Sequence, residues 1–200
     1  MNKKGNEANF LRRRKIIGVM GSSPDYPELT EPLGRLIAGL GHHLLTGAGG
    51  GVMAGVSKSF FDFKKRKGVV LGIIRADPNW AERQKHNPPD YKPNKVNDWV
   101  EIPIYTQLPL SSADLNSRNH INALTSDVII ALPGGKGTES EVELALKYGT
   151  PVIFFLGGGN INGNSPADYI KKFPNSPAST ASDITEVKKE INKHISAISK

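Results

Sequence analysis

The clearest indication of the fold is the segment DVIIALPGGKGTESEVELALKYGTPVIFF, residues 127–155. It opens with an apolar run, residues 127–133, which predicts a buried strand. A glycine-rich turn follows, then a segment with helical spacing at 138–149 and a second apolar run at 150–157. Strand, turn, helix and strand in this order are typical of the unit from which a parallel sheet is built.

The same alternation of strands and helices extends toward the N-terminus. Apolar runs predict further strands at 15–21, within 42–51, at 68–75 and at 99–106, the last an edge strand because it contains Pro103. Helical spacing predicts helices at 29–40, at 52–63 and within 112–126, the last capped by Ser111 or Ser112. The strand runs are apolar throughout, as in strands that are covered on both faces. We therefore predict an α/β fold: a doubly wound, mostly parallel sheet with helices on both faces.

Composition divides the chain into three parts. Residues 1–14 are predicted to be a basic, flexible N-terminus, and residues 15–173 the doubly wound domain. Within this domain, residues 76–98 are proline-rich and lack periodicity, which predicts a long loop. Residues 174–200 are predicted to be a linker (174–181) and an amphipathic helix that packs on the domain. The apolar stripe of this helix consists of Ile184, Val187, Ile191, Ile195 and Ile198.

The composition excludes several classes of protein. With 38% hydrophobic and 22% charged residues, the chain suits a soluble globular domain. It has no cysteine, which rules out disulfides, thiolate zinc sites and cysteine nucleophiles. No apolar stretch reaches the roughly 20 residues of a membrane span, and no hydrophobic signal segment precedes Lys15, so we expect a cytoplasmic protein. No His, Asp and Glu group has metal-ligand spacing, so we predict no metal, and because the sequence offers no sign of a cofactor lysine we also predict no cofactor.

The formal net charge is +7, and much of it lies in short basic runs. Such runs, at 12–15, at 64–67 and near the C-terminus, can bind nucleic acid. They contain no interleaved aromatic residues that would serve as a stacking platform for bases. A solvated basic surface is therefore the favoured interpretation, and a nucleic-acid partner is a weaker third hypothesis beside the two that follow from the glycine turns.

Glycine clusters follow three of the predicted strands, at Gly21, at 47–51 and at 134–137. Ligands of doubly wound sheets bind beyond the carboxyl ends of the strands, where these clusters lie. A glycine-rich turn that leads into a helix presents free backbone N–H groups and the positive end of the helix dipole, which favours a phosphate. We expect a phosphorylated small molecule there, held by Gly21, Ser22, Gly49, Gly50, Gly51, Asn119, Gly134, Gly135, Gly137 and Thr138.

Two common nucleotide motifs do not fit these turns. A triphosphate-binding loop has Ser or Thr directly after its lysine, whereas Lys136 is followed by Gly137. The dinucleotide fingerprint needs a third glycine at the position of Val52, after Gly47 and Gly49. A mononucleotide or a sugar phosphate held between two turns is the simpler prediction.

Thr138 and Glu141 allow two interpretations. Their spacing is that of a capping box, which only starts a helix. A carboxylate in the first turn beside an anion site also lies near the sugar of a bound nucleotide, where it could orient water or stabilise positive charge at the anomeric carbon. Arg118, in the helix before the same strand, is the candidate partner of Glu141, and Asn119 could hydrogen-bond a ribose or a base.

At 133–141 the sequence PGGKGTESE matches the pattern P-G-G-x-G-T-x-x-E, and TGAGGGVMAGV at 46–56 resembles the turn G-G-G-x-x-G-x-M. Both are found in the Lonely Guy family, long labelled lysine decarboxylase-like, which the chain resembles over residues 15–157. The resemblance implies a Rossmann-like nucleotide-binding fold, a homodimer or higher homo-oligomer, and cleavage of the N-glycosidic bond of nucleoside 5′-monophosphates to a base and ribose 5-phosphate. It also implies that the residues of the turn at 134–138 bind phosphate, that Gly49 to Gly51 form a second wall, and that Arg118 and Glu141 are catalytic.

One position departs from the hydrolases of that family. They commonly have Arg-Lys where this chain has Arg118-Asn119. The run from Ser117 to Val152 more closely resembles a sister group that includes molybdenum-cofactor carrier proteins and uncharacterised Rossmann nucleotide-binding proteins. That likeness implies a protein that holds a phosphorylated ligand without hydrolysing it. A phosphoribohydrolase and a non-catalytic binding or carrier protein for a nucleotide or the molybdenum cofactor are thus both left open.

Overall fold

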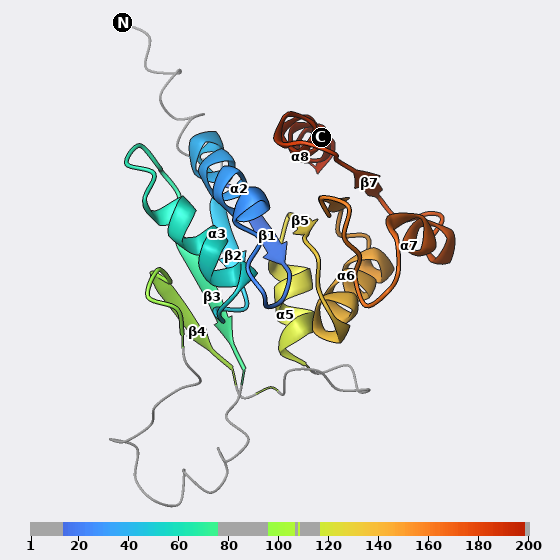
Figure 1. Ribbon diagram of the computed structural model, residues 1–200, viewed down its shortest axis with the longest axis horizontal. Helices are drawn as coiled ribbons and strands as arrows, with labels where there is room; N and C mark the ends of the chain where they lie inside the picture. The colour runs from blue at the N-terminus through green and yellow to red at the C-terminus, as the bar shows by residue number, and fades with distance from the viewer. Residues whose placement is uncertain (1–13, 76–95, 107, 109–116, 199–200) are drawn as a thin grey trace, which may run out of the picture.

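Seven strands form one sheet in the computed structural model, which describes residues 14–75, 96–106, 108 and 117–198 (Figure 1). The strands are β1 (Ile16–Met20), β2 (His43–Thr46), β3 (Val70–Ile74), β4 (Ile102–Tyr105), β5 (Val128–Ala131), β6 (Val152–Phe154) and β7 (Ala178–Thr180). Their order across the sheet is β4-β3-β2-β1-β5-β6-β7, and all neighbouring pairs are parallel. The predicted doubly wound, Rossmann-like α/β architecture is confirmed.

Helices cover both faces of this sheet (Figure 1). They are α2 (Pro27–Leu40), α3 (Val52–Phe61), α5 (Arg118–Thr125), α6 (Lys136–Tyr148), α7 (Pro166–Lys172) and α8 (Ile184–Ile198). Side chains of α2, α3 and α8 share one core cluster with Ile17 and Val19 of β1, whereas α5, α6 and α7 share a second cluster with Met20. Neighbouring strand residues thus point to opposite helical layers, as the strand period of two requires. In the described part of the chain, no helix is both long and apolar enough to cross a membrane.

The apolar stripe of α8 lies against the α2–α3 side of the sheet. Val187 and Ile191 are fully buried in the cluster that contains the α2 and α3 side chains, and Ile184 and Ile195 pack at its margin. Their spacing of three to four residues places them on one helical face. This packing explains why the helix is apolar on one side and strongly charged on the other.

The order of the strands creates a topological switch point between β1 and β5. The chain builds β1 to β4 outward on one side of β1, then crosses over to β5 on the other side. Connections from neighbouring strands therefore diverge above the carboxyl ends of β1 and β5, where a crevice forms in doubly wound sheets. The glycine turns predicted to bind a ligand follow β1, β2 and β5, which are adjacent.

The structure corrects two of the predicted elements. Helix α5 begins at Arg118 and is capped by Ser117, which forms a capping box with His120; the expected caps, Ser111 and Ser112, lie outside the described residues. The segment 174–181, expected to be linker, contains strand β7, which pairs with β6. A three-residue strand is too short to produce a periodic pattern.

Of the remaining predictions, one is confirmed, and two concern segments that lie largely outside the described residues. Pro103 lies in the edge strand β4, as its missing N–H indicated. The predicted flexible N-terminus falls almost entirely outside the described residues, as does most of the predicted loop at 76–98.

Candidate functional site

The loops after β1, β2 and β5 meet at the switch point. The backbone N–H of Ser22 donates to Pro133 O over 3.4 Å, and the N–H of Val52 donates to Ser22 O over 3.3 Å. A Cβ atom at position 51 would lie 2.8 Å from Ser23 Cα, so only glycine allows the β1 and β2 loops to approach this closely. The three glycine-bearing loops therefore form one continuous surface.

Three helices begin at this surface. In α2, α3 and α6, no side chain caps the first turn with a hydrogen bond. The first N–H groups of a helix lack intrahelical partners, and they carry the positive end of the helix dipole. Of the three, α6 suits an anion best, because α2 begins with Pro27, which lacks an N–H, and the first N–H of α3 already donates to Ser22 O.

Thr138 lies inside the first turn of α6. The helix begins at Lys136 with Gly135 as its N-cap, so Thr138 is the third helical residue and cannot be the cap. The interpretation of Thr138 and Glu141 as a capping box is therefore wrong. The Thr138 side chain is 2% exposed, and its Oγ1 has no hydrogen-bond partner among the described residues. A Cβ atom at position 134 would lie 2.2 Å from that Oγ1, so only glycine at this position leaves room for the buried hydroxyl beneath the turn.

Glu141 faces α5 in the space between the two helices. Asn122 Nδ2 donates to Glu141 Oε1 over 2.6 Å, and Arg118 Nη1 lies 3.9 Å from the same oxygen. All three side chains are buried, with Glu141 7% exposed. The predicted partnership of Arg118 and Glu141 is thus present as an ion pair. Asn122 joins it, and no pattern in the sequence indicated a role for this residue.

Burial dominates the electrostatics of this pair. Burial raises the pKa of Glu141, against the lowering effect of Arg118 and of the hydrogen bond from Asn122. Burial also lowers the pKa of Arg118; Glu141 opposes this effect, and the nearby cation Arg75 adds to it. Arg118 thus lies near one carboxylate, Glu141, and near a second cation, Arg75, and this positive excess suits a bound anion.

Several buried polar atoms around Arg118 lack partners. Among the described residues, no hydrogen bond reaches Arg118 Nε or Nη1, Asn119 Oδ1 or Asn122 Oδ1. Buried polar groups in folded proteins are almost always paired, so a cluster of unpaired ones indicates a ligand or bound water. Asn119 Nδ2 lies 3.5 Å from Gly137 O, at the limit of a hydrogen bond, and links α5 to the turn.

The loop after β2 packs against Arg118 and forms another wall of the candidate site. A Cβ atom at position 47 would lie 1.9 Å from Arg118 Nη1, so Gly47 allows the guanidinium to pack on the loop backbone. Gly49 O accepts a hydrogen bond of 3.0 Å from Asn97 Nδ2. Nothing lies within 4 Å of the Cβ position at Gly50 or Gly135, so both residues expose backbone to open space.

A pocket of about 470 Å³ opens on the other side of the α6 N-terminus. The loops after β1, β5 and β6 form its walls. Its lining residues are Ser22, Ser23, Tyr26, Glu28, Leu29, Pro133, Gly134, Gly135, Leu156, Gly157, Gly159 and Asn160. The turn at 157–159 was missed as a site element, although its three glycines directly follow an apolar run and carried the same signal as the other clusters.

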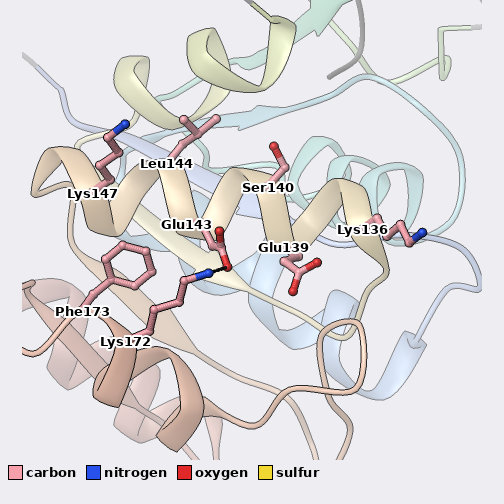
Figure 2. Close-up of a pocket in the computed structure, with 8 residues that line it drawn as sticks. All are labelled: Lys136, Glu139, Ser140, Glu143, Leu144, Lys147, Lys172 and Phe173. Carbon is pink, nitrogen blue, oxygen red and sulfur yellow. Dashed lines mark hydrogen bonds and ion pairs between the residues drawn. The ribbon is translucent and has the colours of Figure 1, made fainter. Parts of the chain in front are cut away.

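A second pocket, of about 540 Å³, lies between α6 and α7 (Figure 2). Its carboxylates are engaged: Glu143 pairs with Lys172, and Glu139 accepts hydrogen bonds from Asn162 and Asn164. Lys136 lines this outer groove and is absent from the lining of the 470 Å³ pocket. These interactions across the groove hold the α7 region against α6.

Within residues 14–75, 96–106, 108 and 117–198, no three His, Cys, Asp or Glu side chains lie close enough together to hold a metal ion.

Comparison with protein families identifies the family to which the chain belongs. Residues 14–190 match the model of the SLOG cluster4 family, and the chain belongs to this family. A relative from Archaeoglobus fulgidus, an uncharacterised protein, is 32% identical over 139 residues, which is 68% of this chain and 76% of that protein. The resemblance to the Lonely Guy and molybdenum-cofactor-carrier superfamily is thereby confirmed.

Solved structures of similar proteins cover nearly the whole chain. The molybdenum cofactor carrier protein from Chlamydomonas reinhardtii is 28% identical, with a TM-score of 0.69, over 92% of this chain and 99% of its own. The molybdenum cofactor binding protein from the phototrophic bacterium Rippkaea orientalis is 33% identical, with a TM-score of 0.63, over 94% and 99%.

Proposed function

We propose that the chain binds a phosphorylated small molecule of the nucleotide or molybdenum-cofactor class and holds it without cleaving it. The observation that carries the proposal is the set of unpaired, buried polar atoms beside the α6 N-terminus. Thr138 Oγ1 and Arg118 Nε and Nη1 can donate to phosphate oxygens, and Thr138 lies in the first turn of α6, which no side chain caps. Relatives described as carrying or binding the molybdenum cofactor support this reading.

The condition of Glu141 favours binding over catalysis. In glycosidic cleavage, a carboxylate must reach the anomeric carbon or a water beside it. Here Glu141 is buried, and its Oε1 is engaged by Asn122 and faces Arg118. The carboxylate therefore serves chiefly to orient Arg118 toward the ligand.

Titration of adenosine 5′-monophosphate and inorganic phosphate by calorimetry tests the proposal. We expect both to bind, with no free adenine detected by chromatography after prolonged incubation. Thr138→Val removes one hydroxyl without changing side-chain shape, and we expect about tenfold weaker binding because a hydrogen bond to a charged group is lost. Thr125→Val, at the opposite end of α5 from Arg118, is the matched control and leaves the affinity unchanged. Absence of binding at millimolar concentrations, or equal affinity in Thr138→Val, contradicts the proposal.

Hydrolysis of the N-glycosidic bond is the second candidate. The Arg118–Glu141 ion pair within the motif P-G-G-x-G-T-x-x-E favours it. Release of adenine by the wild type, lost in Glu141→Gln while nucleotide binding persists, would establish hydrolysis and replace the carrier function. A wild type that binds the nucleotide and returns it intact eliminates the hydrolase.

A further inference from the structure

The 470 Å³ pocket adjoins the proposed phosphate site at the N-terminus of α6. Gly134 and Gly135 line it, and the same two residues form the turn that leads into α6. A ligand whose phosphate lies on this helix N-terminus can therefore extend its next group directly into the pocket. The following inference rests on the proposed function and specifies the ligand of the same site.

The lining of the pocket suits a flat ring. Leu29, Pro133 and Leu156 supply apolar surface, and Tyr26 adds a half-buried aromatic ring. Ser22 and Ser23 contribute hydroxyl groups. The volume lies within the range of about 300 to 1,000 Å³ that is typical of small-molecule sites, and the mixture of apolar walls and a few polar groups is typical as well.

Glu28 is the acidic residue of this lining. It is the second residue of α2, and it has no hydrogen bond or ion pair with any described residue. Its position in the first turn is favourable for the α2 dipole, which explains a carboxylate on the helix but not its orientation toward the pocket. An ionised carboxylate only accepts hydrogen bonds, and its two oxygens match two adjacent donors.

We propose that the pocket receives a heterocycle with a 2-amino-4-oxopyrimidine edge, as in guanine and pterin, and that Glu28 selects it. This edge presents a ring N–H next to an amino group, so both carboxylate oxygens accept a hydrogen bond. Adenine presents an unprotonated ring nitrogen at the corresponding position, which repels the carboxylate. The negative charge of Glu28 also disfavours a second phosphate in the pocket, which makes the site selective for monophosphates.

Competitive calorimetry with four probes tests this assignment: guanosine 5′-monophosphate, adenosine 5′-monophosphate, neopterin monophosphate and inorganic phosphate. We expect the wild type to bind the guanosine and pterin monophosphates at least tenfold more tightly than adenosine monophosphate, and Glu28→Gln to reduce this preference below threefold. Inorganic phosphate, which has no group that extends into the pocket, binds Glu28→Gln no more weakly than the wild type. Glu31→Gln removes the same charge from an exposed position of α2 outside the pocket lining and retains the preference.

Each outcome separates this inference from the proposed function. Equal affinities for guanosine and adenosine monophosphate in the wild type, or an unchanged preference in Glu28→Gln, overturn the role of Glu28 and leave phosphate binding intact. A pterin monophosphate that binds no better than adenosine monophosphate contradicts the shared-edge assignment. If none of the four probes binds, the proposed function fails, and this inference fails with it.

Discussion

The two helical layers of this protein are built from different kinds of contact. Between α2 and α3 the backbones approach closely at Gly34, where a Cβ atom would lie 2.6 Å from Val56 O. Between α5 and α6 an apolar cluster is joined by buried polar contacts, which centre on Arg118 and Glu141. Of the residues with unpaired buried side-chain atoms in the described ranges, only Ser57 lies in the α2–α3 layer, and the others belong to α5 or α6.

The two layers therefore contribute differently to stability and to ligand binding. Close apolar packing stabilises the fold, whereas unpaired buried polar atoms cost free energy unless a ligand satisfies them. A protein retains such a cost where binding requires it. The α2–α3 layer is therefore expected to respond to substitution through stability, and the α5–α6 layer through both stability and ligand affinity.

The largest effect is expected at Gly34. Gly34→Ala places a methyl group against the α3 backbone and lowers the free energy of unfolding by about 3 kcal/mol, measured by urea denaturation. Gly39→Ala on the same helix is the control, because its Cβ atom would meet only Phe63 at 3.8 Å; the higher helix propensity of alanine should raise stability by about 0.5 to 1 kcal/mol. Equal effects of the two substitutions would contradict the close approach of α2 and α3.

Substitution of Asn122 tests the buried polar contacts between α5 and α6. Asn122→Leu removes the hydrogen bond to Glu141, so the free energy of unfolding at pH 7 should fall by about 2 kcal/mol. It also raises the pKa of Glu141 further above the usual value of 4.5, because one of the interactions that lowers this pKa is lost. The folded protein then binds more protons than the unfolded chain in the window that begins near pH 4.5 and extends upward. Stability falls as pH rises through that window, so the defect of the variant should be larger at pH 7 than at pH 4. A defect that is independent of pH would exclude an ionised Glu141 as the acceptor.

Substitution of one threonine in each helical layer compares the two layers directly. Thr138→Val removes an unpaired buried hydroxyl and should stabilise the free protein by about 1 kcal/mol. Thr30→Val removes a hydroxyl that donates to Asp25 Oδ1 over 3.0 Å in the α2–α3 layer, and should destabilise it by about 1 kcal/mol. Thermal unfolding of both variants without ligand decides the comparison, and changes of the same sign would break it.

His194 on α8 gives the smallest expected effect. Burial, together with Lys193, lowers its pKa below the usual 6.5, against the influence of Glu190. The folded protein therefore binds fewer protons than the unfolded chain around and below pH 6.5, and stability falls as pH drops through this region. We expect His194→Gln to remove a slope of about 1 kcal/mol or less between pH 7 and pH 5 in urea denaturation. An identical slope in the variant would assign the pH dependence to other groups.

The sequence predicted those features that depend on local pattern. The strand, glycine turn and helix at 127–149 were recognised because the apolar run and the turn residues are contiguous. Glu141 was assigned to two opposed roles, and the structure rejects the capping role because the helix begins at Lys136, upstream of Thr138. An uncapped N-terminus leaves no side-chain signal, since its N–H groups remain available to a ligand.

Features that depend on distant segments could not be predicted. The Asn122–Glu141 contact joins two helices whose relative rotation is set by packing on the sheet. The pocket that includes Glu28 exists because β1, β5 and β6 are adjacent, an order that no single stretch of sequence encodes. Strand β7 forms only because β6 offers it an open edge.

Native mass spectrometry of the freshly purified full chain, combined with phosphorus analysis, shows whether the protein carries a phosphorylated ligand. We expect a non-covalently bound, phosphorus-containing small molecule on the 21.7 kDa chain, strongly depleted in Thr138→Val and retained in Thr30→Val. A wild-type chain that carries no phosphorus and acquires none after incubation with millimolar nucleoside monophosphates would contradict this expectation.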